Sequence, residues 1–70
     1  MPDKIQISLA AARVNAGLTQ SDMAQKMGVS NKTIVNWEKG KIRPKAAQFH
    51  YFCELAGIDP DYIFLPHSET

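Results

Sequence analysis

The chain has 70 residues, of which 44% are hydrophobic and 21% are charged, a composition typical of one small globular domain. This length excludes a large enzyme with a separate cofactor domain, and the single cysteine, Cys53, excludes an internal disulfide framework. No apolar run approaches the roughly 20 residues that a membrane-spanning helix needs. We therefore expect an intracellular protein without a membrane segment.

The net charge of +1 conceals a strong separation of charge along the chain. Residues 26–45 contain six Lys or Arg residues and one Glu, whereas residues 46–70 contain four Asp or Glu residues and no Lys or Arg. A basic block of this kind is a candidate docking surface for an anionic polymer. A solvated, charged loop is the alternative that the charges alone leave open.

Short helices separated by Gly, Pro and small polar residues are predicted, with no alternating strand pattern and no repeat. The first helix is expected at about residues 5–16, with Asp3 as a possible N-cap. Its buried stripe is expected to consist of Ile5, Leu9, Ala12 and Ala16. A second apolar strip on its far side, formed by Ile7, Ala11 and Val14, is either exposed or a seat for a partner.

Two helices are predicted in the middle of the chain, at about residues 20–27 and 31–39. Thr19 and Ser30 are good N-caps for them, because a hydroxyl oxygen accepts a hydrogen bond from a free N–H of the first turn. Since only Gly28-Val29-Ser30 separates the two helices, they must cross at a large angle. This is the helix-turn-helix arrangement, in which the second helix can lie in the major groove of DNA.

Two more helices are expected at about residues 45–56 and 60–65. The apolar face of the longer helix consists of Phe49, Phe52, Cys53 and Ala56. The shorter helix begins with Asp59-Pro60, since an acidic cap followed by proline favours a helix start. The predicted domain covers residues 1–66 and leaves residues 67–70 as a frayed tail.

The predicted helix at residues 31–39 has one buried and one outward side on a wheel of about 100° per residue. Ile34 and Trp37 fall on the buried side. The outward side consists of Asn31, Lys32, Val35 and Asn36. An Asn amide can pair with adenine, a Lys ammonium can donate to guanine, and a Val can contact a thymine methyl group. These side chains therefore predict base reading, with an ordinary solvated helix face as the alternative.

A longer pattern of residues covers about residues 5–65. It consists of Gly17-Leu18-Thr19-Gln20, Met23-Ala24, Met27-Gly28-Val29-Ser30, Ile34, Trp37-Glu38, Gly40, Pro44, Phe49, Phe52-Cys53 and Ala56-Gly57-Ile58. In this pattern the chain resembles the phage repressor and Cro-like helix-turn-helix family, which includes xenobiotic-response-element-type regulators. The resemblance implies an all-α, lambda-repressor-like domain of five helices. It also implies a cytoplasmic, nucleoid-associated transcriptional regulator, most often a repressor, that binds double-stranded operator DNA as a homodimer.

The resemblance also implies roles for individual residues. Asn31, Lys32 and Asn36 match positions that read bases. The positions that match contacts to the DNA backbone are Gln20, Ser30, Thr33, Lys39, Lys41 and Arg43. Gln20 also matches a glutamine that braces the recognition helix. Arg13 and Glu38 match a buried ion pair, and on the wheel Glu38 falls at the edge of the buried side, where a carboxylate needs a partner. By analogy with the family, the candidate dimer contacts are Ile58, Tyr62 and Phe64.

Other kinds of chemistry find little support in the sequence. His50 and His67 lie far apart and show no metal-ligand spacing, and Cys53 lies on a buried stripe where cysteine acts as a small hydrophobic residue. We therefore predict no enzyme activity, no cofactor, no metal and no small-molecule ligand. An antitoxin-type or other protein-binding module on the same fold is the alternative function.

Overall fold

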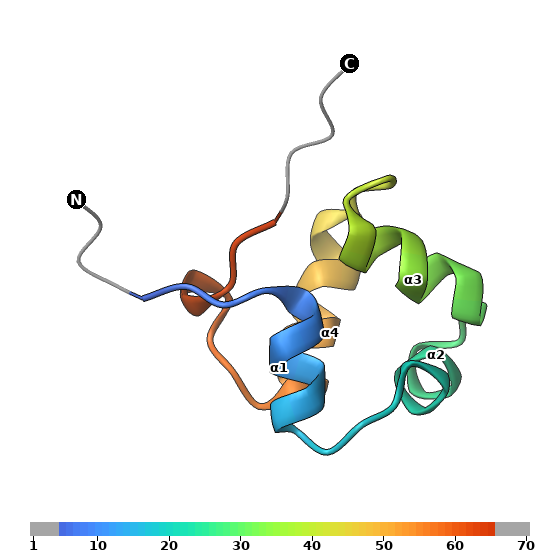
Figure 1. Cartoon of the computed structure of the whole chain (residues 1–70), viewed down its shortest axis with the longest axis horizontal. Helices are drawn as coiled ribbons and strands as arrows, with labels where there is room; N and C mark the ends of the chain where they lie inside the picture. The colour runs from blue at the N-terminus through green and yellow to red at the C-terminus, as the bar shows by residue number, and fades with distance from the viewer. Residues whose placement is uncertain (1–4, 66–70) are drawn as a thin grey trace.

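The computed structural model describes residues 5–65, which form four α-helices and one turn of 3-10 helix (Figure 1). The elements are α1 (Leu9–Asn15), α2 (Gln20–Met27), α3 (Asn31–Lys39), α4 (Ala46–Ala56) and η1 (Pro60–Tyr62). The all-helical class agrees with the prediction, but the count of five helices is wrong for the described chain. Of the helices in Figure 1, α2 is seen almost end-on while α3 runs across the view.

The first helix begins later than the sequence suggested, at Leu9 instead of residue 5. Ser8 is its N-cap, with the Oγ atom accepting a hydrogen bond of 3.0 Å from the Ala11 N–H. The proposed cap Asp3 lies outside the described residues. Because Ile5 precedes the helix, it does not join the buried stripe, and its side chain is 85% exposed.

The segment before α1 pairs with the segment that follows η1. Ile7 and Ile63 form a parallel β-bridge, in which the Ile7 N–H donates to the Tyr62 carbonyl oxygen at 2.8 Å and the Phe64 N–H donates to the Ile7 carbonyl oxygen at 3.0 Å. This pairing requires extended backbone at Ile63, so the predicted helix at residues 60–65 ends after the single turn of η1. Asp59 caps that turn as expected, since its Oδ1 atom accepts from the Asp61 N–H at 2.8 Å.

The core lies where the four helices meet. Its buried residues are Leu9, Ala12, Met23, Ala24, Ile34, Trp37, Phe52, Cys53 and Ile63. Ala16, predicted to be buried, is exposed near the end of α1, while Phe49 and Ala56 are half-buried against the core. Of the second strip predicted on the first helix, Ile7 packs against the core and only Val14 is clearly exposed, at 61%. The strip therefore does not form a continuous apolar surface.

The middle and last α-helices agree closely with the sequence prediction. α2 and α3 have the predicted bounds, and α4 begins one residue later than expected because Lys45 is its N-cap. The Gln48 Oε1 atom accepts a hydrogen bond of 2.9 Å from the Lys45 N–H. This bond satisfies a free donor at a helix start that lacks a hydroxyl or acidic cap.

Candidate nucleic-acid interface

The turn between α2 and α3 is fixed by short-range hydrogen bonds. Gly28 has φ of 69°, a left-handed conformation that a residue with a Cβ atom adopts only at a cost. The Val29 N–H donates to the Ala24 carbonyl oxygen at 3.0 Å, and the Thr33 N–H donates to Ser30 Oγ at 3.1 Å. Because the link is short and bonded on both sides, α3 is held crosswise to α2 (Figure 1).

One side of α3 is buried and the other is open. Ile34 and Trp37 are 0% and 2% exposed, which places this tryptophan in the core and not on a nucleic-acid surface. We define the reading face as the four side chains predicted to read bases, Asn31, Lys32, Val35 and Asn36. The first two are exposed and the last two are half-buried. Within residues 5–65, none of these four side chains makes a hydrogen bond or ion pair, so their polar groups are available to an outside partner.

A network of three side chains sets the position of α3 against the rest of the molecule. The Arg13 Nε atom of α1 lies 2.7 Å from Glu38 Oε2, and its Nη1 atom donates to the Leu18 carbonyl oxygen at 2.8 Å. The Arg13 and Glu38 side chains are only 11% and 7% exposed. This is the ion pair implied by the family resemblance, and it links α1 to the last turn of α3.

Gln20 joins the same network, in keeping with the bracing of the recognition helix that the family resemblance implies for this glutamine. Its Nε2 atom donates to Glu38 Oε1 at 3.0 Å, so the amide nitrogen is already bonded within the protein. The role of Gln20 as a phosphate contact stays a prediction. In the structure, this side chain at the start of α2 bonds Glu38 and in this way helps to hold α3 in place.

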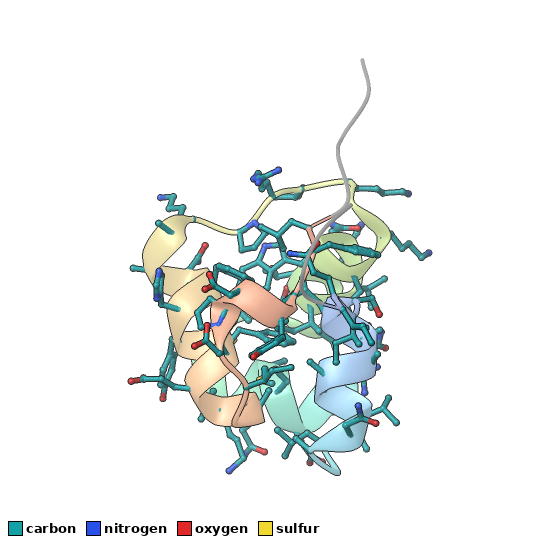
Figure 2. The ribbon with its side chains drawn as sticks, turned by 90° about the vertical axis from the view of Figure 1, so that its left-hand side faces the viewer. Carbon is teal, nitrogen blue, oxygen red and sulfur yellow. The ribbon has the colours of Figure 1, made fainter. Side chains whose placement is uncertain are left out.

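The other predicted backbone contacts lie at the two ends of α3. At its N-terminal end, Ser30 Oγ and Thr33 Oγ1 are 2.9 Å apart and bond to each other. At its C-terminal end, Lys39 is exposed, and the loop at residues 40–45, here named the basic loop, exposes Lys41 and Arg43. Nitrogen-tipped side chains stand out along this loop at the top of Figure 2. Exposed cations thus lie in the last turn of α3 and in the loop that follows it.

Comparison with known proteins decides the family. The helix-turn-helix family model matches residues 9–63, most of the chain. The chain belongs to the Cro/C1-type helix-turn-helix family. An uncharacterized HTH-type transcriptional regulator of Methanocaldococcus jannaschii is 40% identical over 48 residues, which cover 69% of this chain and 73% of that protein. No solved structure matches the chain.

A second relative of this helix-turn-helix protein has a similar coverage. An uncharacterized HTH-type transcriptional regulator of Methanothermobacter thermautotrophicus is 36% identical over 45 residues, which cover 64% of this chain and 65% of that protein. Among residues 5–65, no helix has the length and apolar character needed to cross a bilayer.

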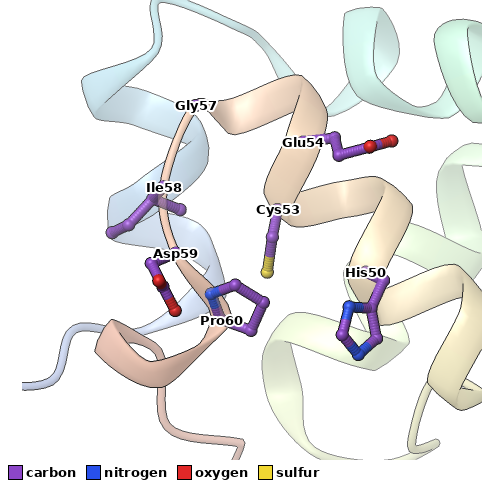
Figure 3. A pocket seen from close by; sticks show the side chains of 7 residues that line it. All are labelled: His50, Cys53, Glu54, Gly57, Ile58, Asp59 and Pro60. Carbon is purple, nitrogen blue, oxygen red and sulfur yellow. The ribbon is translucent and has the colours of Figure 1, made fainter.

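Away from the helix-turn-helix, an open hollow of about 350 Å³ lies between α4 and η1 (Figure 3). Its lining includes His50, Cys53, Glu54 and Asp59. Burial of the Cys53 thiol, with a smaller contribution from Asp59, raises its pKa and so disfavours the reactive thiolate.

No group of three His, Cys, Asp or Glu side chains in the described chain is arranged to hold a metal ion. His67 lies outside the described residues.

The candidate dimer contacts of the helix-turn-helix protein do not share one environment. Ile58 packs against the core, whereas Tyr62 and Phe64 are 44% and 42% exposed beside the β-bridge. Two further large apolar side chains, Ile5 and Ile42, are 85% and 52% exposed, which the sequence did not indicate. Nothing in their sequence spacing distinguishes them, because their exposure depends on the extended segment before α1 and on the path of the basic loop.

Proposed function

We propose that this helix-turn-helix protein is a transcriptional regulator that binds double-stranded DNA sequence-specifically, with α3 in the major groove. The observation that carries the proposal is the reading face, whose two amides and ammonium have no hydrogen-bond or ion-pair partner within residues 5–65. The polar members match the donors and acceptors of base edges, and Val35 matches a thymine methyl group. Asn31, Lys32, Val35 and Asn36 are the proposed base-reading residues.

Cations at the end of this face supply the sequence-independent part of the binding. We assign contacts with the DNA backbone to the residues at both ends of α3 and to the start of α2. These residues are Gln20, Ser30, Thr33, Lys39, Lys41 and Arg43. Hydrogen bonds and ion pairs to phosphate fix the orientation of a protein on the duplex, while contacts in the groove provide sequence preference.

A homodimer on a two-fold symmetric operator completes the proposal. One copy offers a short reading helix, and a second copy placed about 34 Å away, one turn of DNA, doubles the contacts. Tyr62 and Phe64 are exposed near each other in the chain and are the better candidates for the contact between copies, while Ile58 contributes mainly to the core. Repression is the regulatory effect we propose, by blocking access to the bound site, in a cytoplasmic protein associated with the nucleoid.

Salt dependence of binding to a duplex of mixed sequence tests the proposal. We expect binding at low salt, with a linear fall of the logarithm of affinity against the logarithm of salt concentration. Lys41→Ala and Arg43→Ala should each weaken binding and flatten this slope by about 0.9, the value for one lost phosphate contact. Lys26→Ala removes the same charge from the exposed last turn of α2, at a member of the basic block that is not among the assigned backbone contacts. It therefore separates the position of a charge from net charge, and its slope should change less than the slopes of the two loop variants.

Absence of binding at low salt, with the helical fold intact by circular dichroism, would contradict the proposal and favour the antitoxin-type or other protein-binding module. An unchanged slope in both loop variants would remove Lys41 and Arg43 from the contacts. Equal effects of all three substitutions would mean that net charge, and not the position of the basic loop, governs the interaction.

A further inference from the structure

An exposed isoleucine stands between two cations in the basic loop. Ile42 is 52% exposed, and its neighbours Lys41 and Arg43 are exposed as well. A single exposed apolar side chain is ordinary on a protein surface, so its exposure alone assigns no role. Its position is more informative, because both flanking residues carry the charge that draws the loop to an anionic partner.

The backbone presents Ile42 from a fixed position. The Asn36 carbonyl oxygen accepts hydrogen bonds from the Lys41 N–H at 2.9 Å and from the Ile42 N–H at 3.3 Å. Two residues further on, the loop is held again by Pro44, which is buried. Asn36 belongs to the reading face. Its backbone carbonyl therefore connects the basic loop to a residue that we propose reads bases. In Figure 1 the loop projects from the body at this end of α3.

We infer that Ile42 packs against the deoxyribose of the DNA backbone beside the groove that α3 enters, an inference that rests on the proposed function. Along a DNA strand the charged phosphates alternate with sugars, whose carbon atoms offer an apolar contact. A loop that alternates cation, isoleucine and cation matches this sequence of groups, with Lys41 and Arg43 at phosphates and Ile42 between them. The side chain removes apolar area from water without neutralising any phosphate.

The charge of the loop favours DNA over an apolar groove of a protein as the partner of Ile42. Charged residues are depleted at the centre of protein–protein interfaces. Here exposed cations flank the isoleucine on both sides, and Lys45 follows the buried proline as a further exposed cation. An apolar protein groove would have to cover or exclude these charges, whereas the backbone of a duplex pairs with them.

The experiment separates apolar contact from charge by comparing affinity with salt slope. The whole chain, Ile42→Ala and Ile42→Val are titrated onto a duplex of mixed sequence over a range of salt concentrations. Ile42→Ala should bind about three- to tenfold more weakly at every salt concentration, with the slope unchanged, because about one to one and a half methylene equivalents of contact are lost without a change in counterion release. Ile42→Val keeps the branched side chain and should stay within about twofold of the unchanged protein. Thermal unfolding of each variant verifies that the exposed substitution leaves the fold intact.

Affinity of Ile42→Ala equal to that of the unchanged protein would overturn the inference and leave Ile42 free for a protein partner. A changed salt slope would overturn it as well, since the substitution would then act through the charges of the loop. These outcomes differ from failure of the proposed function, in which the unchanged protein itself does not bind the duplex at low salt.

Discussion

The helix-turn-helix at the centre and the two ends of the described chain are stabilised over very different distances along the sequence. In α2 the Asp22 N–H donates to Thr19 Oγ1 and the Thr19 N–H donates to Asp22 Oδ2, so each partner lies three residues away. At the ends, Gln6 Nε2 donates to the Asp61 carbonyl oxygen, 55 residues away, beside the bridge between Ile7 and Ile63. Local bonds set where the helices of the helix-turn-helix begin, whereas the ends depend on the finished fold.

This contrast assigns different tasks to the two regions. The central helices and the basic loop carry the reading face and the cations. Caps and a short turn set the bounds of these helices, and the network of Arg13, Gln20 and Glu38 holds α3 against α1. The extended segments at the ends close the core over α1 and α4, with Ile63 buried, and expose apolar side chains beside the bridge. Contact with DNA is therefore expected from the first region, and contact with a second copy of the chain from the second.

The largest expected effect comes from the ion pair that holds the helix-turn-helix against α1, because Arg13 lies on α1 and Glu38 on α3. Glu38→Ala leaves a guanidinium that is only 11% exposed without its carboxylate, and deprives Gln20 of its acceptor. We expect a loss of about 2–4 kcal/mol in the free energy of unfolding, measured by urea denaturation.

The double variant Arg13→Met with Glu38→Leu is the control for this substitution. Replacing both charges with apolar side chains leaves no unpaired charge, so much of the lost stability should return. A cost of Glu38→Ala below about 0.5 kcal/mol, the value of a solvent-exposed pair, would mean that the network does not hold α3.

The cap of α1 is expected to have an intermediate effect, and it tests the extended segment at the N-terminal end. Ser8→Ala removes the acceptor of the Ala11 N–H and should lower the free energy of unfolding by about 1 kcal/mol. Ser21→Ala, on the exposed side of α2, removes a hydroxyl that accepts no bond from a helix terminus and is the matched control. Equal unfolding free energies for the two variants would place the start of α1 elsewhere.

These caps also explain which parts of the fold the sequence could predict. The bounds of α2 and α3 were predictable because Thr19, Ser30, Gly28 and Gly40 act on residues within one helical turn of themselves. The start of α1 was not, because Ile5 and Ile7 fit a helical spacing as well as extended backbone, and only the bridge of Ile7 with Ile63 selects the extended form. The same pairing replaces the predicted final helix by a single turn.

The candidate site shows a similar division. The outward side of α3 followed from helical spacing alone, since Ile34 and Trp37 define the buried side. The bond from Gln20 to Glu38 and the exposure of Ile42 did not follow, because each depends on how separate elements meet in space. The roles of Gln20 and Ile42 in binding DNA stay predictions.

The smallest expected effect concerns the pH dependence of the cap of α2. Hydrogen bonds from the backbone and side chain of Thr19, with a smaller contribution from Lys26, lower the pKa of the exposed Asp22 carboxyl from its ordinary value of 3.8. The ionised carboxylate therefore stabilises the fold above that pH, and this stabilisation is lost as the pH falls through the lowered pKa.

Asp22→Asn should lower the melting temperature slightly near neutral pH, because the charge at the N-terminus of α2 is lost. The difference from the unchanged protein should shrink as the pH falls below the ordinary carboxyl value, since the native side chain then becomes neutral as well. Thermal unfolding by circular dichroism across this pH range provides the measurement. A difference independent of pH would mean that the effect of the substitution does not come from the charge.

Selection of duplexes from a random DNA pool, carried out in parallel with the unchanged protein and Asn36→Ala, tests the base-reading role of α3 most directly. The account predicts a two-fold symmetric consensus for the unchanged protein, and the loss of preference at one position of each half-site for Asn36→Ala. At that position the selected site should lose about 1–3 kcal/mol of binding free energy. Pools without any consensus, or the same consensus from both proteins, would contradict it.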